Sequence, residues 1–240
     1  MGIGVGTFTS SSLKYRDKIQ QLCSFNHLIV RDDESLKNAK AHCPGIKVSV
    51  ATDIVFDTDL WMPVLKEEKK STPTKKNIGI ILRDWQSDMS YDYLDDVLLH
   101  LEEIRNQFTI TCFSFDARTD KKYISKFKEQ GWDVIVWQPQ SMDLSGYLSK
   151  LSLQDFLITS RFHGAIIGAC FGIPGVCINI EPKLKSAVVM LNNSYALKNL
   201  PIDFLIDKNN CKNLMNGAFE ILNEKVKLNV ELNKTILQNI

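Results

Sequence analysis

Short apolar runs alternate with amphipathic stretches of about 10 to 15 residues along most of this chain. The apolar runs predict strands at residues 3–5, 28–30, 47–51, 77–82, 108–113, 134–137, 155–159, 176–180 and 204–206. The amphipathic stretches predict helices at residues 12–23, 34–42, 91–106, 121–130, 144–151, 184–191 and 211–237, with a further helix that begins near residue 163. Strands that alternate with helices in this way form parallel sheets through right-handed crossovers. We therefore expect an α/β fold with Rossmann-like parallel sheets.

One charged segment, residues 63–76, interrupts the alternation and contains two prolines without apolar periodicity. We interpret it as a linker between a partial N-terminal Rossmann-like domain at residues 1–62 and a C-terminal Rossmann-like domain at residues 77–240. The second domain has enough strands and helices to be complete, whereas the first has about half of a doubly wound domain. Asp32 or Asp33 is expected to cap the helix at residues 34–42, because aspartate accepts hydrogen bonds from the first amides of a helix.

The charge balance and the hydropathy exclude some classes of partner. The 29 basic and 28 acidic residues give a net charge of +1. Proteins that bind a phosphate backbone usually carry a clear basic excess, so nucleic acid is not expected as a partner. The longest stretch without charges, residues 164–180, contains Pro174 and Gly175 and is shorter than the roughly 20 apolar residues of a membrane helix. No transmembrane segment is expected.

The six cysteines are scattered and include no Cys-x-x-Cys pair. They are Cys23, Cys43, Cys112, Cys170, Cys177 and Cys211. Most fall in apolar strand or helix contexts, which is typical of reduced thiols in the core of a cytoplasmic protein. Residues 1–8 lack the basic start and the apolar core of a secretory leader. We therefore expect a cytoplasmic location, which includes the inner face of the membrane, and no bound metal.

The most informative segment begins at residue 158 and reads Ile-Thr-Ser-Arg-Phe-His-Gly, followed by Ala-Ile-Ile-Gly-Ala-Cys-Phe-Gly-Ile-Pro. A buried strand ends in an arginine and a histidine. A helix of small residues follows at once, and such a helix can pack its backbone close to a sheet. Arg161 and His163 are thus expected at the carboxyl end of a strand and the amino end of a helix, where open α/β sheets bind anionic ligands.

A lysine follows the next strand along the chain. Lys183 comes shortly after the strand predicted at residues 176–180, and Lys185 lies about half a helical turn further on. Parallel strands joined by a crossover present their carboxyl ends at one edge of the sheet, so Arg161, His163 and Lys183 are expected to converge. Two cations and a histidine suit a ligand that carries both a phosphate and a carboxylate.

This combination resembles the polysaccharide pyruvyl transferase family: Ser-Arg-Phe-His-Gly, a helix of small residues, Gly-Ile-Pro, and a strand that ends near a lysine. The resemblance runs from about the first residue to about Ser194. It implies an architecture similar to glycosyltransferases of the B fold, with roughly a hundred further upstream residues in other members, so that this chain has an incomplete first domain. It also implies transfer of the pyruvyl group of phosphoenolpyruvate onto two sugar hydroxyls, which forms a cyclic ketal. The sugar would belong to a bacterial-type surface polysaccharide or exopolysaccharide, or to its precursor.

The resemblance also implies roles for residues at other strand ends. The histidine and the lysine that bind the donor in the family match His163 and Lys183. Arg31, in Val-Arg-Asp-Asp-Glu-Ser, matches an arginine that reaches the donor, and Arg83 matches another arginine of the family. Asp53 matches an aspartate that follows the corresponding strand. Asp116, after the strand at residues 108–113, is a further candidate for the same cleft.

These residues support a chemical hypothesis. Arg31, Arg161 and Lys183 would hold the phosphate and carboxylate of the donor and neutralise charge in the transition state. His163 would act as general acid or base, so it and Arg161 are the candidate catalytic residues. The scheme requires no metal and no cofactor. Its partners are phosphoenolpyruvate and a sugar, polysaccharide or lipid-linked oligosaccharide acceptor.

Other interpretations remain open. A glycosyltransferase of the B fold would bind a sugar nucleotide at the same strand ends, and a truncated, non-catalytic remnant would retain only the donor domain. Structural roles are also available, since Arg31 could pair with Asp32 or Glu34 and Asp53 could cap a turn. The acceptor sugar, the hydroxyl pair that reacts, the completeness of the chain and the oligomeric state are not encoded in these patterns.

Overall fold

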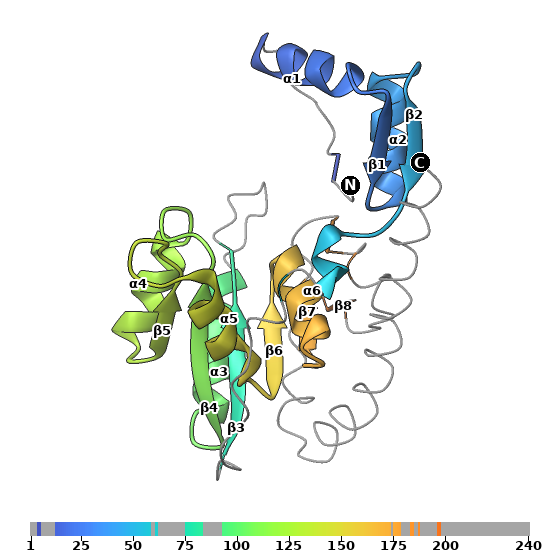
Figure 1. Ribbon diagram of the computed structural model, residues 1–240. Helices are drawn as coiled ribbons and strands as arrows, with labels where there is room; N and C mark the ends of the chain where they lie inside the picture. The colour runs from blue at the N-terminus through green and yellow to red at the C-terminus, as the bar shows by residue number, and fades with distance from the viewer. Residues whose placement is uncertain are drawn as a thin grey trace. The chain divides into compact units, whose positions relative to one another are not determined.

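The computed structural model describes residues 4–5, 13–58, 61, 75–83, 93–173, 175–178, 183–184, 187 and 196–197. The chain divides into two compact units (Figure 1). Unit 1 comprises Met1–Thr58 and Val226–Ile240, and unit 2 comprises Asp59–Lys225. The predicted linker at residues 63–76 lies outside the described residues except for its last two positions, and Lys76 already opens a strand of unit 2.

Unit 1 is a small parallel βα arrangement. Its elements are α1 (Leu13–Cys23), β1 (His27–Val30), α2 (Asp33–His42), β2 (Lys47–Val50) and the short 3-10 helix η1 (Ile54–Phe56). β1 and β2 pair in parallel, which places their carboxyl ends at one edge. Asp32 caps α2, because its side chain accepts a hydrogen bond from the Ser35 amide at 2.7 Å. It is one of the two residues predicted for this role.

Val5, near the start of the chain, is held in unit 1 by two side chains of α2. The Val5 amide donates to Ser35 Oγ at 2.9 Å, and Asn38 Nδ2 donates to the Val5 carbonyl at 2.9 Å. Both partners are buried on α2, so the two backbone polar groups of Val5 are satisfied there. The strand predicted at residues 3–5 is represented only by residues 4 and 5, which are not in a strand.

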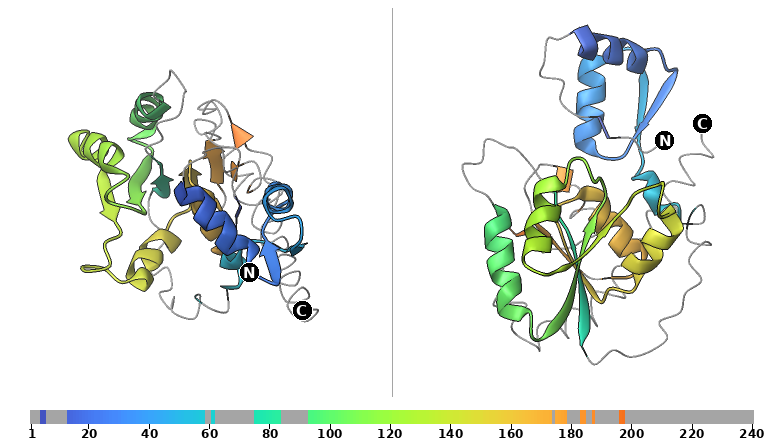
Figure 2. Two further views of the ribbon diagram at one scale, coloured as in Figure 1. Left: turned by 90° about the horizontal axis from the view of Figure 1, so that it is seen from above. Right: turned by 90° about the vertical axis from the view of Figure 1, so that its left-hand side faces the viewer.

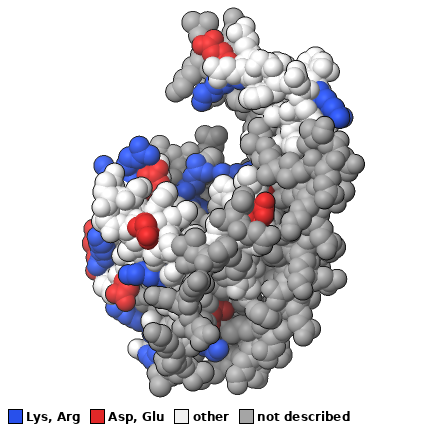
Figure 3. All heavy atoms as spheres, viewed as in Figure 1, with Lys and Arg blue, Asp and Glu red and all other residues white. Residues whose placement is uncertain are grey.

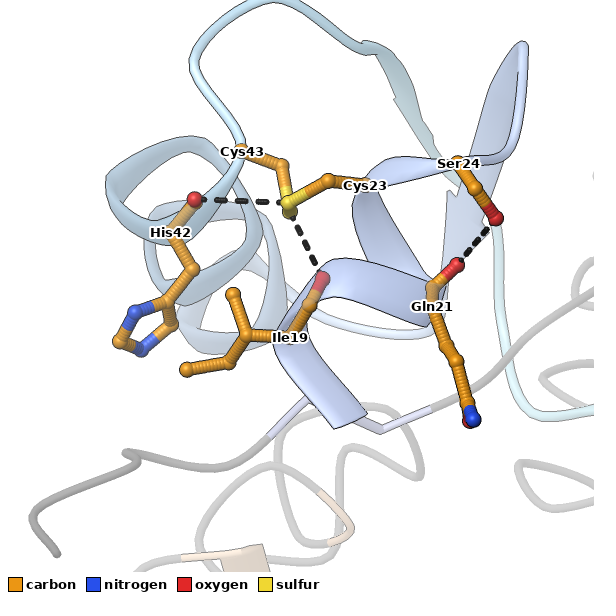
Figure 4. Close-up of a disulfide and its surroundings, with 6 residues drawn as sticks. All are labelled: Ile19, Gln21, Cys23, Ser24, His42 and Cys43. Carbon is orange, nitrogen blue, oxygen red and sulfur yellow. Dashed lines mark hydrogen bonds between the residues drawn. A yellow bond between two sulfur atoms is a disulfide. The ribbon is translucent and has the colours of Figure 1, made fainter. Parts of the chain in front are cut away.

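A disulfide between Cys23 and Cys43 corrects the expectation of reduced thiols (Figure 4). It joins the end of α1 to the residue that follows α2, with 5.2 Å between the Cα atoms. Figure 4 shows both sulfurs between the two helices, near the carbonyl oxygens of Ile19 and His42. Disulfides persist mainly in oxidising compartments, so the thiol argument for a cytoplasmic location no longer holds.

Unit 2 contains a parallel sheet in the order β5-β4-β3-β6-β7-β8 (Figure 1). Its strands are β3 (Lys76–Ile81), β4 (Phe108–Ser114), β5 (Asp133–Val136), β6 (Phe156–Thr159) and β7 (Gly175–Ile178), extended by the two residues of β8 (Ala196–Leu197). Every neighbouring pair is parallel. This order is that of a doubly wound Rossmann sheet, which confirms the predicted fold class.

In the described part of unit 2, four helices cover the two faces of this sheet: α3 (Tyr93–Ile104), α4 (Lys121–Glu129), α5 (Leu144–Ser152) and α6 (Phe162–Cys170). Successive residues of β4 point to opposite faces, so Cys112 meets Tyr123 of α4 whereas Phe113 packs on Tyr147 of α5. α4 and α5 therefore lie on opposite sides (Figure 2). The α5 face holds a buried apolar cluster: Ile81, Phe113, Tyr147, Leu148, Leu151, Leu157 and Ile173.

The predicted element order of unit 2 is confirmed from β3 to β7, with boundaries shifted by a few residues at most. β6 is buried at all four positions, which explains its continuous apolar sequence. β8 was not predicted from the sequence. The strand predicted at residues 204–206 and the helix at 211–237 lie outside the described residues, and so does most of the helix at 184–191. Among the described residues there is no helix with the length and hydropathy to span a membrane.

Two buried thiols of unit 2 are expected to resist alkylation in the native protein. Burial raises the pKa of Cys177 to about 12 and the pKa of Cys112 well above its ordinary value. Thiolate, the reactive form, is therefore scarce at about pH 8. Mass spectrometry after iodoacetamide treatment should find both residues unmodified until denaturant is added. Modification of the native protein at the rate of a small free thiol would contradict this.

Candidate functional site

The strand order reverses between β3 and β6, and the segments that follow these two strands meet at the carboxyl edge of the sheet. In doubly wound sheets this is the position at which ligands bind. The Ser160 amide donates to the Ile81 carbonyl at 2.9 Å, and the Arg83 amide donates to Ser160 Oγ at 2.9 Å. Fully buried Ser160 thus joins the two strand ends and fixes the start of the turn that leads into α6.

Arg161 is held at this edge by contacts with two other chain segments. Its Nε donates to the Leu82 carbonyl at 3.0 Å, just beyond β3. Its terminal Nη2 forms an ion pair with Oδ1 of Asp120, which precedes α4 and whose side chain is completely buried. The guanidinium also lies 5.9 Å from the centre of the Phe115 ring. The predicted donor-binding arginine is therefore engaged within the protein.

Aromatic residues surround this ion pair on the α5 side. Phe115 packs edge-on against Tyr147, with 5.8 Å between ring centres, and the Tyr147 hydroxyl donates to the Ser114 carbonyl at 3.0 Å. Burial raises the pKa of Tyr147 well above its ordinary value, against the opposing influence of the Arg161 charge. Tyr147 therefore serves as a neutral hydrogen-bond donor that orders the end of β4 and is not a candidate acid or base at neutral pH.

α6 packs unusually close to the sheet, because two of its glycines leave room for neighbouring side chains. A Cβ atom on Gly164 would lie 2.4 Å from Thr159 Oγ1, and one on Gly168 would lie 2.4 Å from Leu157 Cδ1. Thr159 Oγ1 also accepts a hydrogen bond from the Arg161 amide at 3.0 Å. The small residues predicted for this helix thus fix its distance from β6. His163, in the first turn of α6, is exposed.

The other predicted residues of unit 2 differ in their surroundings. Arg83 follows β3 and is half-buried, next to the fixed turn at Ser160. Lys183 is half-buried in a helical segment after β7, the neighbour of β6, so the strand order brings its chain segment to the same edge. Asp116 is a surface residue whose carboxylate pairs with exposed Arg118 at 3.3 Å, and that hydrogen bond lowers its pKa.

In unit 1 the structural partners of Arg31 and Asp53 are clear. Arg31 pairs with Asp53 at 3.0 Å and with Asp32 at 3.2 Å, and the side chains of Arg31 and Asp53 are only 12% and 3% exposed. Asp53 also caps η1 by accepting from the Val55 amide at 3.1 Å. A Cβ on Gly4 would lie 2.7 Å from Arg31 Cζ, so the glycine backbone covers the guanidinium. Arg31 thus pairs with Asp32 and Asp53 caps a turn, as their structural interpretations predict, and the donor contacts of both residues stay predictions.

Asp120 is the residue of this edge that sequence reasoning missed. It lies only four residues from Asp116, the candidate predicted from the sequence, which follows the end of β4 by two residues. The only feature of the sequence that marks Asp120 is its position before the amphipathic helix at residues 121–129, which is typical of an ordinary helix start.

On the surface formed by α4 and β5, side chains of both charges are interspersed and do not form a patch of one sign (Figure 3).

The comparisons agree with the motif. The family model for polysaccharide pyruvyl transferases matches residues 1–182, about three quarters of the 240 residues. This chain belongs to that family. The match includes the Ser160–His163 turn and both candidate residues of unit 1, and it ends one residue before Lys183. The family is one of transferases that act on polysaccharides. No curated protein matches the chain closely enough to count as a relative.

The chain is similar to two solved structures at low sequence identity. The N-terminal domain of trehalose-6-phosphate phosphatase from Candida albicans superposes with a TM-score of 0.54 at 11% identity, over 95% of this chain and 61% of that one. The wall teichoic acid polymerase TagF gives a TM-score of 0.45 at 13% identity, over 97% of this chain and 59% of that one. The chain thus spans about three fifths of the length of both proteins. The first likeness supports the fold alone.

Proposed function

We propose that this protein transfers the pyruvyl group of phosphoenolpyruvate to a sugar of a surface polysaccharide or of its lipid-linked precursor. The observation that carries the proposal is the position of the family's Ser-Arg-Phe-His turn. It follows β6 at the reversal of the strand order, where doubly wound sheets bind anionic ligands. Phosphoenolpyruvate carries a phosphate and a carboxylate, which suits an edge supplied with Arg83, His163 and Lys183.

The proposed chemistry needs an acid, a base and positive charge, and no metal or cofactor. Exposed His163 gives a proton to the methylene carbon of the donor, which becomes a methyl group and leaves an oxocarbenium-like carbon. One acceptor hydroxyl adds to that carbon and loses its proton to a base. The phosphate then departs, and a second hydroxyl of the same sugar adds and loses its proton. The products are the cyclic ketal and inorganic phosphate.

The cations have distinct tasks in this scheme. Arg83 and Lys183 bind the phosphate and carboxylate and neutralise the charge on the departing phosphate. Arg161 already forms an ion pair with Asp120, so its main contribution is to order the turn that carries His163. Arg31 and Asp53, which form an ion pair in unit 1, remain candidates for the donor or the acceptor sugar.

Substitution of the candidate residues is expected to weaken phosphoenolpyruvate binding. His163→Ala and Lys183→Ala should each raise the dissociation constant by about tenfold or more, because a hydrogen bond to a charged group contributes about 1.5–3 kcal/mol. Isothermal titration calorimetry of the full chain measures this directly. Matched controls are His100→Ala and Lys150→Ala, which remove the same side chains from α3 and α5, and both variants should bind as the wild type does.

A sugar nucleotide titrated in parallel tests the main rival. If the folded wild-type protein binds a sugar nucleotide and not phosphoenolpyruvate, the proposed donor is wrong and glycosyl transfer becomes the better interpretation. If it binds neither, the proposal fails for this chain by itself. Release of inorganic phosphate on incubation with phosphoenolpyruvate and an acceptor polysaccharide would extend the test from binding to turnover.

A further inference from the structure

We propose that Asp120 is a positioning residue of the donor site: through its ion pair with Arg161 it fixes the turn that carries His163. This inference rests on the proposed function, because it assigns a task in binding the same donor. It adds a residue that lies outside the Ser160–His163 motif, 41 positions upstream of Arg161 and on the opposite side of β3.

The first argument is the burial of Asp120. Its side chain is completely inaccessible, yet a buried carboxylate is costly unless it is paired and hydrogen-bonded. Three groups of its own loop supply hydrogen bonds: the Ser114 hydroxyl at 2.9 Å, the Asp116 amide at 3.3 Å and the Thr119 hydroxyl at 3.4 Å. Arg161 supplies the countercharge. A carboxylate satisfied in this way is a rigid anchor.

The second argument is the set of segments that Arg161 joins. Asp120 stands between β4 and α4, Leu82 stands just after β3, and Arg161 itself stands between β6 and α6. The side chain therefore ties together the carboxyl ends of three adjacent strands at the reversal of strand order. With Asp120 removed, the guanidinium keeps its hydrogen bond to the Leu82 carbonyl and its contact with the Phe115 ring, but its positive charge loses its counterion in a partly buried place.

The third argument concerns the consequence for chemistry. His163 is two residues beyond Arg161, and the Arg161 backbone is itself fixed by Thr159, whose hydroxyl accepts from the Arg161 amide and donates to its carbonyl at 3.1 Å. The Arg161 carbonyl also accepts the Ala165 amide at 3.2 Å and so begins α6. A shift of the Arg161 side chain would thus be transmitted to the first turn of the helix, where an error of about 1 Å is enough to weaken catalysis or binding.

A positioning role for Asp120 and a direct contact between Arg161 and the donor predict opposite effects on donor affinity. If Arg161 were chiefly a ligand, then Asp120 would compete with the donor for the guanidinium, and Asp120→Asn would leave affinity unchanged or improve it. If Asp120 is a positioning residue, Asp120→Asn weakens the affinity for phosphoenolpyruvate by about tenfold. Arg161→Gln then has a similar effect, and the double variant loses no more than either single one, because all three changes break the same contact.

The experiment combines calorimetry with hydrogen exchange on the full chain. Variants Asp120→Asn, Arg161→Gln and their combination are titrated with phosphoenolpyruvate, and the exchange of the peptide covering residues 160–165 is followed by mass spectrometry. Asp133→Asn is the matched control, since it neutralises an exposed carboxylate of unit 2 at the start of β5, away from the carboxyl edge of the sheet. The double variant carries no uncompensated buried charge, so it remains informative if a single variant fails to fold.

The outcomes separate the inference from the proposed function. Weaker binding with faster exchange in the Asp120 and Arg161 variants, but not in Asp133→Asn, supports the inference. Unchanged exchange and affinity in Asp120→Asn overturn it, as do losses that add fully in the double variant. If the wild type binds no phosphoenolpyruvate, the proposed function has failed. Exchange at residues 160–165 would still report whether the ion pair orders the turn.

Discussion

Replacing Gly164 with alanine is expected to destabilise unit 2 and weaken the donor site, although alanine is the better helix former. The added Cβ would lie 2.4 Å from Thr159 Oγ1 and 3.2 Å from Ile81 Cδ1. Thr159 is β-branched and stiff, and its hydroxyl is hydrogen-bonded to the backbone of Arg161, so it cannot turn away without breaking those bonds. α6 must therefore move away from the sheet, and the Arg161 turn moves with it.

The expected loss for Gly164→Ala is about 2–4 kcal/mol of unfolding free energy. Overpacking typically costs about 1–3 kcal/mol and each lost hydrogen bond about 1 kcal/mol, whereas the helix preference of alanine returns up to about 1 kcal/mol. Urea unfolding followed by the exchange of β3 and β6 amides measures this for unit 2. Gly45→Ala is the control, because a Cβ there has no neighbour within 4 Å. Equal stability of Gly164→Ala and the wild type would show that α6 tolerates the displacement.

The fold of unit 2 could be predicted because each local pattern agrees with the final structure. The four buried residues of β6 are apolar, and the small residues of α6 match the close approach that the structure requires. Strand order was not encoded locally. It follows from right-handed crossovers, and the resulting reversal between β3 and β6 explains why Arg161 and Arg83 lie at a single edge.

The candidate site was harder to predict than the fold, because ion pairs join residues far apart in the sequence. Arg161 was predicted from its place after a strand, but its partner Asp120 is separated from it by α4, β5, α5 and β6. Similarly, the Arg31–Asp53 pair joins the ends of β1 and β2. In both units an arginine at one strand end pairs with a buried aspartate that follows another strand of the same sheet: the adjacent strand in unit 1, and the next strand but one in unit 2. The place of each arginine after a strand predicted it as a site residue, whereas the aspartate that neutralises its charge is revealed only by the tertiary structure.

Loss of the disulfide is expected to destabilise unit 1 selectively. The bridge between Cys23 and Cys43 closes a loop with a sequence separation of 20. By the chain-entropy relation such a cross-link stabilises the folded state by about 3 kcal/mol, because it restricts the unfolded chain. The described part of unit 1 has a small apolar cluster, with only Val5, Leu28, Val30 and Ala39 buried in it. A contribution of this size is therefore a large share of its stability.

The test compares the wild-type protein with a Cys23→Ser/Cys43→Ala double variant, each with and without dithiothreitol. Alanine is chosen at position 43 because that side chain is buried and a serine hydroxyl there would need a partner. Hydrogen exchange in β1 and α2 should accelerate about a hundredfold when the wild type is reduced, which corresponds to about 3 kcal/mol. The double variant should exchange at that fast rate in either condition.

Unit 2 provides the internal control within the same measurement. The cysteines in its described part, Cys112, Cys170 and Cys177, are buried thiols outside any disulfide, so dithiothreitol has no bond to break among them and exchange in β3 and β6 should stay constant. Faster exchange in both units when the protein is reduced would mean that the two units unfold together. No change in unit 1 on reduction, or detection of Cys23 and Cys43 as free thiols by mass spectrometry, would show that the bridge is not formed and would restore the thiol argument for a reducing compartment.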